Sequence, residues 1–482
     1  MSDQEVGDTD FGLQVGLGSL GNASSAVVGM IGAIILARIL GPDGYGLFYV
    51  ALGVANLFEN PVNGWATACK KRLTETDFDA EEALGSVLVM TFVLSLVGAP
   101  LAYFTLSLTT TNEIIPLAVP ILFIPMSTYW ALTRILSGRS NFSLAAWSTV
   151  SHTLFKIASQ IVLVVLGFDV WGMVGGAAVG SILVIPIVYR WIGVRPVFPS
   201  RSSFASIGEF AKWSIPQGFV GTALSRMDVI LLGWLSSSAI AGNYQVALKL
   251  TLPAMFISSA INNGLMARVS NLESRGDYWS EDVTNALSLT GLLAIPIAFG
   301  AITIGEEVLV TIYSSQYAGA GSFLIGLAIY RLLVTLSSPL ESVVVGLDYP
   351  RLSFYISLTR FVLNVTAGLI LWYLIGPIGI VVATVITQVL SYLMYVAAVR
   401  SLANRTSYIP QPLLKQILAG AVMALSVWVA RKFVGTQEVL TVILLVALGA
   451  VVYSTLLITI SPFIRVTAKG IYADLRSEYI TS

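Results

Sequence analysis

Four basic side chains lie within long apolar stretches of the sequence, where an ionised group is costly unless it has a partner or a function. They are Lys156, Arg226, Lys249 and Arg331. In a medium of low dielectric constant, guanidinium and ammonium groups bind phosphate through charge-assisted hydrogen bonds. We therefore predict that these bases line a cavity and that at least one of them contacts an anionic head group.

Further charged candidates for this cavity are Asp228, Glu341 and Arg360. They also leave structural ion pairing open as an alternative. Asp228 lies two residues from Arg226, a spacing at which helical side chains do not face each other, so Arg226 could face the cavity while Asp228 meets Lys249, or the converse. The structural alternative is an ion pair of Asp228 with Arg226 or Lys249. Glu341 could pair with Arg331 in the same way.

Amide and acidic side chains follow a helical period in residues 46–68. Asn56, Glu59, Asn60 and Asn63 fall at positions i, i+3, i+4 and i+7, which is one face of a helix. This face cannot contact lipid, because unpaired polar groups are too costly there. Amides and carboxylates suit sugar hydroxyls, and we favour a cavity lining. Hydrogen bonding between helices explains the pattern equally well.

A similar polar face is predicted around Lys156. His152 and Gln160 lie one turn before and one turn after it, so the three side chains share one side of a helix. They either line the cavity, with Lys156 at a phosphate, or form a buried contact between helices.

The composition predicts that these charges lie in a membrane. The chain has 482 residues, of which 56% are hydrophobic and 11% charged, with a mean hydropathy of +0.83. A soluble domain carries about 25% charged residues. The net charge is zero, so nucleic acid is not an expected partner. The single cysteine, Cys69, excludes an intrachain disulfide. We predict no cofactor and no metal site, and without a phosphate-loop motif the chain is not expected to hydrolyse nucleotides.

Apolar stretches of roughly 20 residues predict about fourteen spanning helices in an all-α membrane protein. They lie near 13–38, 46–68, 84–107, 114–136, 144–167, 171–191, 209–233, 239–264, 285–310, 322–346, 352–375, 378–400, 412–432 and 438–460. The stretch 239–264 is the weakest. Most of the 26 Lys and Arg residues fall in the loops after even-numbered helices and in the C-terminal tail. The positive-inside rule then places both termini in the cytoplasm.

A weak internal repeat relates the two halves of the chain. YGLFYVAL at 45–52 matches AGNYQVAL at 241–248, so that Gly46 corresponds to Gly242. Six predicted helices separate the copies, and an even number makes the repeat parallel, as in transporters with two lobes around a central cleft. The predicted parts are an acidic cytoplasmic tail 1–12, an N-lobe 13–191, a linker 192–208, a C-lobe 209–400, a helix pair 412–460 and a cytoplasmic tail 461–482.

The segment LARILGPDGYGLFYVAL, residues 36–52, resembles the first extracytoplasmic turn of Wzx-type polysaccharide flippases. These belong to the multidrug/oligosaccharidyl-lipid/polysaccharide exporter superfamily. The resemblance is carried by Arg38, Gly41, Pro42, Tyr45 and Gly46. The residues from Gly41 to Gly44 are also strong turn formers, and Arg38 at a helix C-terminus would interact favourably with the helix dipole.

The resemblance implies a flippase of the cell membrane that moves a polyprenyl phosphate- or diphosphate-linked sugar to the outer leaflet by alternating access. Such a flippase would serve cell-surface polysaccharide synthesis or protein glycosylation, including S-layer N-glycans. The expected partners are membrane lipid, this substrate and a downstream glycan transferase or polymerase, and the chain is expected to be a monomer.

Two other functions remain open. One is a cation-coupled drug antiporter of the same superfamily, for which Glu59 is the obvious intramembrane acid of the first lobe. The other is a membrane-embedded glycosyl- or phospho-transferase. That enzyme would need clustered acids, and Asp77, Asp79, Glu81 and Glu82 form such a cluster, although a solvated loop explains it better. The bases outnumber the acids within the spans, which favours an anionic head group over a cationic drug. We predict that the chain is not an enzyme.

Overall fold

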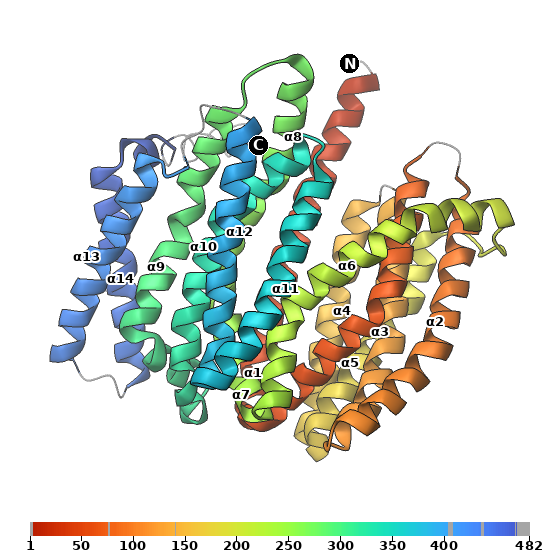
Figure 1. Cartoon of the computed structure of the whole chain (residues 1–482), viewed down its shortest axis with the longest axis horizontal. Helices are drawn as coiled ribbons and strands as arrows, with labels where there is room; N and C mark the ends of the chain where they lie inside the picture. The colour runs from red at the N-terminus through yellow and green to blue at the C-terminus, as the bar shows by residue number, and fades with distance from the viewer. Residues whose placement is uncertain are drawn as a thin grey trace. The chain divides into compact units, whose positions relative to one another are not determined.

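The computed structural model describes residues 3–75, 78–139, 141–402, 408–434, 438–467 and 469, without the side chains of 3–20, 22, 23 and 263. These residues form helices and short connections and no strand, as predicted (Figure 1). The α-helices are α1 (Asp3–Leu73), α2 (Ala80–Thr109), α3 (Ile114–Gly138), α4 (Phe142–Leu163), α5 (Asp169–Ile192), α6 (Arg201–Leu235), α7 (Ser238–Leu250), α8 (Phe256–Arg275), α9 (Ser280–Ile312), α10 (Gly321–Gly346), α11 (Pro350–Ile375), α12 (Ile378–Leu402), α13 (Gln411–Phe433) and α14 (Val439–Ile460). Short π- or 3₁₀-helical pieces are η1 (Val164–Phe168), η2 (Leu252–Met255) and η3 (Ser315–Ala320).

Within the described residues, 11 helical segments are long and apolar enough to cross a membrane, or 12 if the bent pair α7–α8 is one crossing. Two of the segments, Ser24–Leu73 and Phe142–Ile192, contain 50 and 51 residues. A helix of that length extends about 75 Å, more than twice the roughly 30 Å of a hydrocarbon core. Each therefore contains two crossings, and the count then agrees with the predicted helices. The chain is a multi-pass membrane protein.

Glycines with positive φ divide both long segments. Gly41 has φ 67° and ψ 179° inside α1, and Gly167 has φ 92° between α4 and α5. Glycine adopts these angles without the steric cost of a Cβ. Pro42 follows Gly41 and begins the second segment of α1, where its missing N–H leaves no helical bond unmade. The turn predicted at Gly41 and Pro42 is thus present, with Arg38 exposed just before it.

The weak stretch near 239–264 is a broken helix. Ser238–Leu250 and Leu252–Arg275 meet at an angle of 42°. Pro253 lies in η2 at the bend, and because proline cannot donate a backbone hydrogen bond it disfavours an uninterrupted helix there.

Contacts divide the chain into two compact units, unit 1 ending at Gln245 and unit 2 beginning at Val246. Unit 1 contains α1 to α6 and most of α7, and unit 2 contains the rest. The predicted repeated lobes, 13–191 and 209–400, have other bounds than these two units, and the division into lobes stays a prediction.

Gly46 and Gly242, the corresponding glycines of the predicted repeat, each pack against the segment that contains the other, within unit 1. A Cβ on Gly46 would overlap the carbonyl of Ser238, and a Cβ on Gly242 would overlap the carbonyl of Pro42. In the register of the repeat, Pro42 corresponds to Ser238, so the contact is reciprocal. Reciprocal contacts are what a two-fold relation between two copies produces.

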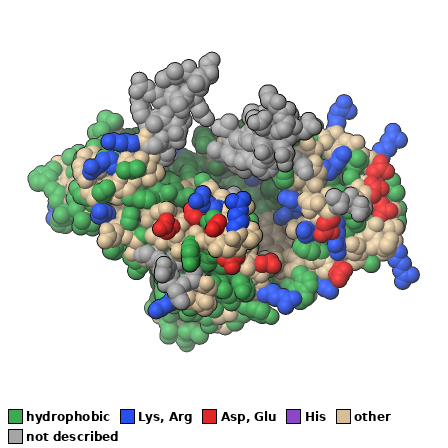
Figure 2. All heavy atoms as spheres, turned by 90° about the horizontal axis from the view of Figure 1, so that it is seen from above, with side chains coloured by type: hydrophobic (Ala, Val, Ile, Leu, Met, Phe, Trp, Pro, Cys, Tyr) green, Lys and Arg blue, Asp and Glu red, His purple; other side chains and the backbone are tan. Residues whose placement is uncertain are grey.

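Side-chain type separates the flanks of the helices from their ends. Large apolar side chains such as Phe92 of α2 and Leu393 of α12 are 68% and 54% exposed, as expected for surfaces in contact with lipid. Charged pairs lie at helix ends, including Arg268 with Asp282 at 2.7 Å. Figure 2 shows Lys, Arg, Asp and Glu side chains gathered on the face seen there, with hydrophobic side chains around it.

Candidate functional site

The second segment of α1, residues 42–73, packs closely along α6 within unit 1. A Cβ on Gly64 would overlap Ile215, and the Ser214 hydroxyl donates a hydrogen bond of 2.8 Å to the Gly64 carbonyl. Small residues at a membrane helix interface allow this close approach. The contact determines which face of α1 meets α6, and that face carries most of the predicted polar stripe.

Two amides of the stripe bind α6 directly. The Asn56 side-chain oxygen, with the amide oriented to satisfy both partners, accepts hydrogen bonds of 2.9 and 3.1 Å from Nε and Nη2 of Arg226. Asn60 Nδ2 donates a bond of 3.0 Å to the Gly218 carbonyl. For these two residues, hydrogen bonding between helices is therefore present.

The other two members of the stripe, Glu59 and Asn63, hydrogen-bond each other through their side chains, but each keeps one buried oxygen without a described partner. Glu59 is 4% exposed and lies near Arg226, yet its Oε1 has no hydrogen-bond partner among the described residues. Asn63 Oδ1 is also buried without one. A buried polar atom left unpaired costs about 1–3 kcal/mol, and such atoms commonly belong to sites that bind water, ions or substrate. We refer to Asn56, Glu59, Asn60, Asn63 and Arg226 as the α1–α6 polar cluster.

Arg226 is the basic centre of this cluster. Its guanidinium forms no ion pair with a described residue, and its hydrogen-bond partner Asn56 is a neutral amide. Tyr49 and Tyr244 lie close to it. The Tyr244 hydroxyl donates a bond of 2.9 Å to Asp228 Oδ2. The sequence did not mark these tyrosines, because an aromatic residue in an apolar helix gives no signal of its own.

The polar face around Lys156 packs against α5. His152 Nε2 lies 3.0 Å from the Ser181 hydroxyl, and the ring stacks on Tyr129 with centroids 4.1 Å apart. Gln160 Nε2 donates to the Met173 carbonyl at 2.9 Å. For His152 and Gln160 the structure shows the buried helix contact that was the alternative interpretation.

Lys156 itself is held close to α5 by its backbone. A Cβ on Gly180 would overlap the Lys156 backbone, and one on Gly176 would overlap the Gln160 backbone. Gly176 and Gly180 thus form a small-residue face of the kind that brings membrane helices together. The Lys156 side chain is half-buried.

In unit 2, the predicted charged residues have partners other than those expected. Arg331 Nη1 donates to the Met255 sulfur at 2.8 Å, while its buried Nε has no partner among the described residues. Glu341 is exposed and accepts a bond of 3.1 Å from Ser353. No ion pair joins Arg331 and Glu341, so that alternative does not apply in this structure. Lys249 lies half-buried in the last turn of α7.

Arg360 belongs to a hydrogen-bonded network of α10, α11 and α12. Its Nη1 donates to Gln388 Oε1 at 2.7 Å, and Gln388 Nε2 donates to the Ser337 hydroxyl at 2.9 Å. One turn later, Asn364 Nδ2 donates to Thr384 at 3.0 Å and to Thr387 at 3.4 Å. We refer to these six residues as the α10–α12 polar network. For Arg360 the structure thus shows a hydrogen bond to a neighbouring helix.

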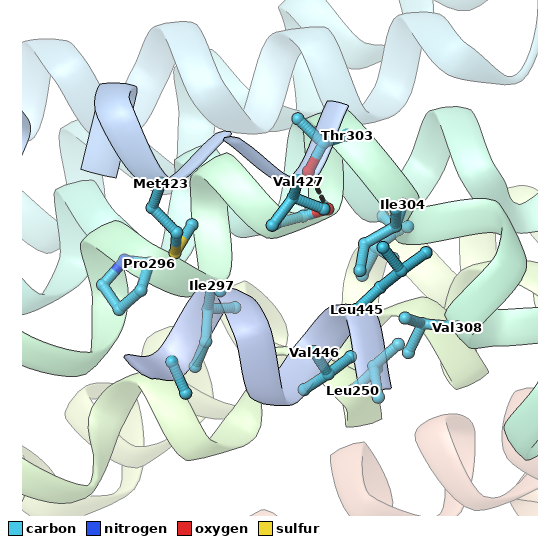
Figure 3. A pocket seen from close by; sticks show the side chains of 16 residues that line it. Leu250, Pro296, Ile297, Thr303, Ile304, Val308, Met423, Val427, Leu445 and Val446 are labelled. Carbon is cyan, nitrogen blue, oxygen red and sulfur yellow. Dashed lines mark hydrogen bonds between the residues drawn. The ribbon is translucent and has the colours of Figure 1, made fainter. Parts of the chain in front are cut away.

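An apolar cavity of about 300 Å³ lies in unit 2 between α9, α13 and α14 (Figure 3). Pro296, Ile297 and Ile304 of α9, Met423 and Val427 of α13 and Leu445 of α14 surround it. Thr303 contributes the only hydroxyl, and that hydroxyl is bonded to the backbone of its own helix. This cavity could not be predicted from the sequence, because its lining residues are of the same types as residues that face lipid.

No group of three or more His, Cys, Asp and Glu side chains that could hold a metal ion occurs among the described residues. The polar groups of the site are therefore amides, one acid and one guanidinium. Such a set can bind anions and hydroxyl groups through hydrogen bonds.

The sequence matches a family described as "Polysaccharide biosynthesis protein" over residues 35–321. The chain is 23% identical over 471 residues to the probable flippase AglR of Haloferax volcanii, which covers 94% of this chain and 96% of the relative. It is 21% identical over 463 residues to the probable low-salt glycan biosynthesis flippase Agl15 of the same organism, covering 93% and 96%.

The fold is similar to a solved structure of the lipid II flippase MurJ in an inward closed conformation. The TM-score is 0.78 at 16% identity, and the match covers 92% of this chain and 98% of that one. This likeness supports the helical architecture described above.

Proposed function

The chain belongs to the polysaccharide biosynthesis protein family, and we propose that it is a flippase for a lipid-linked glycan. The cargo would be a sugar or oligosaccharide on a polyprenyl phosphate or diphosphate, moved from the cytoplasmic to the outer leaflet by alternating access. Two relatives that span nearly the whole chain are named as flippases. The observation that carries the proposal is the Arg226 guanidinium, which lies in a membrane helix near Glu59 but forms no ion pair with a described residue.

The α1–α6 polar cluster suits the phosphate and first sugar of such a cargo. Arg226 supplies charge-assisted donors, which are strong in a medium of low dielectric constant. The unsatisfied oxygens of Glu59 and Asn63 can accept hydrogen bonds from sugar hydroxyls. Arg331 of unit 2, whose Nε lacks a described partner, is a second candidate for the anionic group.

The apolar cavity of unit 2 suits part of an isoprenoid chain. Its volume of about 300 Å³ and its hydrocarbon lining match a flexible apolar ligand. A Cβ on Gly300 would meet open space, so a larger side chain can enter the cavity without displacing the backbone. We expect Gly300→Leu to slow transport of a long-chain substrate by roughly 3- to 10-fold, because losing the burial of one or two methylene groups costs about 1 kcal/mol.

Gly300→Ala is the matched control for this prediction, because it fills little of the cavity, and it should transport at nearly the wild-type rate. The measurement is the flipping rate of substrates with long and short prenyl chains. Equal rates for Gly300→Leu and Gly300→Ala with the long-chain substrate would show that the cavity does not bind the isoprenoid chain during transport.

The proposed topology places both termini and the basic loops in the cytoplasm, and the membrane is the cell membrane. It rests on the distribution of Lys and Arg. A cysteine-accessibility scan of Ser238→Cys and Ser280→Cys in a Cys69→Ala background tests it. Position 238 should react with a membrane-impermeant maleimide in intact cells, and position 280 only after lysis. The reverse labelling would overturn the proposed orientation.

The function is tested by reconstituting the purified chain in vesicles that contain fluorescent polyprenyl diphosphate-linked sugars. We expect the chain to accelerate the appearance of the label in the opposite leaflet, measured with an impermeant quencher. The alternative is a cation-coupled drug antiporter. Cation-driven efflux of a cationic dye, without movement of the lipid-linked sugar, would favour that function and exclude ours.

A further inference from the structure

A second cavity, of about 450 Å³, lies in unit 1 at the turn between α2 and α3. The last turn of α6, the first residue of α7 and the beginning of the second segment of α1 complete it. Its polar lining consists of Thr109, Thr110, Thr111, Asn112, Trp234 and Ser238. None of these residues belongs to the α1–α6 polar cluster.

Hydrogen bonds within the α2–α3 turn leave several donors available to a ligand. Asn112 Oδ1 accepts from the backbone N–H of Ile114 at 2.9 Å and so caps α3, which leaves its amide N–H₂ free to donate. Thr110 Oγ1 accepts from the Asn112 N–H at 3.1 Å and keeps its own O–H. The exposed Thr111 hydroxyl has no hydrogen bond with a described residue. The donors of Thr110, Thr111 and Asn112 therefore remain, whereas the Thr109 hydroxyl donates to the Thr105 carbonyl and the Ser238 hydroxyl to Asp43.

Trp234 gives the cavity an aromatic wall. It is 47% exposed at the end of α6. Its neighbour Gly233 packs so closely on Val50 of α1 that a Cβ there would overlap the valine side chain. The end of α6 therefore packs against α1, and the half-exposed indole next to it offers an aromatic face and an N–H donor.

We propose that this cavity binds a neutral hexose unit of the glycan. The inference rests on the proposed function and adds a glycan-binding subsite to it. Hydroxyl and amide donors around an aromatic ring are suited to a sugar, which presents hydroxyl oxygens and an apolar ring face. The described lining residues include no Lys, Arg, Asp or Glu, so a phosphate or a charged lipid head group finds no counter-charge. In the proposed topology the α2–α3 turn is extracytoplasmic, which is where the glycan is released.

The test uses saturation-transfer NMR on the full chain in lipid nanodiscs prepared without sugar-based detergent. The probes are the free disaccharides maltose, cellobiose and mannobiose, with phosphocholine as the lipid head-group probe. We expect at least one disaccharide to bind and phosphocholine to give no signal. Trp234→Leu should weaken disaccharide binding about 3- to 10-fold, as expected for the loss of one aromatic contact.

Trp213→Leu is the matched control, because Trp213 is an exposed tryptophan of the same helix, 65% exposed and outside the cavity lining. It should bind the disaccharide like the wild type. Thr111→Val removes only a hydroxyl that makes no hydrogen bond with a described residue, and it should also weaken binding. This variant tests the site even if Trp234→Leu does not fold. The inference is overturned if no disaccharide binds, if phosphocholine binds in its place, or if both tryptophan variants behave alike.

Failure of this inference can be distinguished from failure of the proposed function. If the reconstituted chain moves the lipid-linked sugar but Trp234→Leu and Thr111→Val bind free disaccharide like the wild type, the subsite is wrong and the flippase stands. If disaccharide binding depends on Trp234 but no lipid-linked sugar moves, the subsite stands and the flippase is wrong.

Discussion

The α1–α6 polar cluster of unit 1 and the α10–α12 polar network of unit 2 contain similar side chains but differ in how fully those side chains are hydrogen-bonded. Each contains an arginine that donates to a side-chain amide, Arg226 to Asn56 and Arg360 to Gln388. In the α10–α12 polar network, Gln388 in turn donates a hydrogen bond to the Ser337 hydroxyl. None of the six side chains has a buried polar atom that lacks a hydrogen-bond partner. In the α1–α6 polar cluster, Glu59 and Asn63 each have one buried oxygen that lacks a described hydrogen-bond partner.

The difference separates polar residues that hold helices together from polar residues that remain available to a ligand. A fully bonded network inside a membrane protein stabilises one arrangement of helices. Unpaired buried atoms destabilise the fold, so they persist where another requirement outweighs that cost. Sequence position alone does not distinguish the two cases, because both consist of a base and amides at helical spacing.

Replacing the two arginines should have the largest effect. We expect Arg226→Gln to lower the rate of glycan-lipid flipping by roughly 10- to 100-fold, because a hydrogen bond to a charged group is worth about 1.5–3 kcal/mol. Arg360→Gln should leave the rate within about 3-fold and instead lower the thermal midpoint, since it removes a bond of the network. Rates and thermal midpoints are measured on the same reconstituted samples. Equal loss of transport in both variants would show that Arg226 and Arg360 do not differ in their role in transport.

The two acids provide a second, smaller contrast. Glu59 lies near Arg226 and competes with an anion for its charge, so Glu59→Gln should bind the anionic substrate more tightly and release it more slowly. We expect a lower half-saturating concentration and a turnover reduced by roughly 3- to 10-fold, as one charge near a guanidinium can produce. Glu341→Gln, at an exposed acid bonded to Ser353, should change neither value. A raised half-saturating concentration for Glu59→Gln would contradict this role.

The smallest contrast concerns stability. Asn364→Ala removes the partner of Thr384 and Thr387 and should cost about 1–2 kcal/mol. Asn63→Ala removes a buried oxygen without a described partner and one hydrogen bond to Glu59, and it should cost only about 0.5–1 kcal/mol, since a single bond is lost. Thermal unfolding in detergent measures both. If Asn63→Ala is the more destabilising variant, Asn63 is a structural residue and the cluster is smaller than described.

Much of the fold follows from the sequence because a bilayer imposes simple rules. Apolar length predicted the crossings, and the turn at Gly41 and Pro42 was predicted from residue types that allow few other structures. The break within α7–α8 appeared in the sequence only as a weak apolar stretch, because Pro253 interrupts it. The helical spacing of Asn56, Asn60 and Asn63 correctly indicated one shared face, and in the structure much of that face meets α6.

The partners of individual side chains could not be predicted. Whether His152 lines a cavity or packs on Ser181 depends on the close approach that Gly176 and Gly180 permit between α4 and α5, and helix pairing is not encoded in the spacing of one helix. Arg331 meets Met255 rather than Glu341 for the same reason. The apolar cavity and the cavity at Trp234 arise from the ends and gaps of several helices, which leave no pattern in the sequence.

The most direct test of the account compares wild-type chain, Arg226→Gln and Arg360→Gln in vesicles that contain a fluorescent polyprenyl diphosphate-linked sugar. The measured quantity is the initial rate at which an impermeant quencher gains access to the label. We predict acceleration by the wild type and by Arg360→Gln, and little or none by Arg226→Gln. No acceleration by the folded wild type, or an unchanged rate for Arg226→Gln, would contradict this prediction.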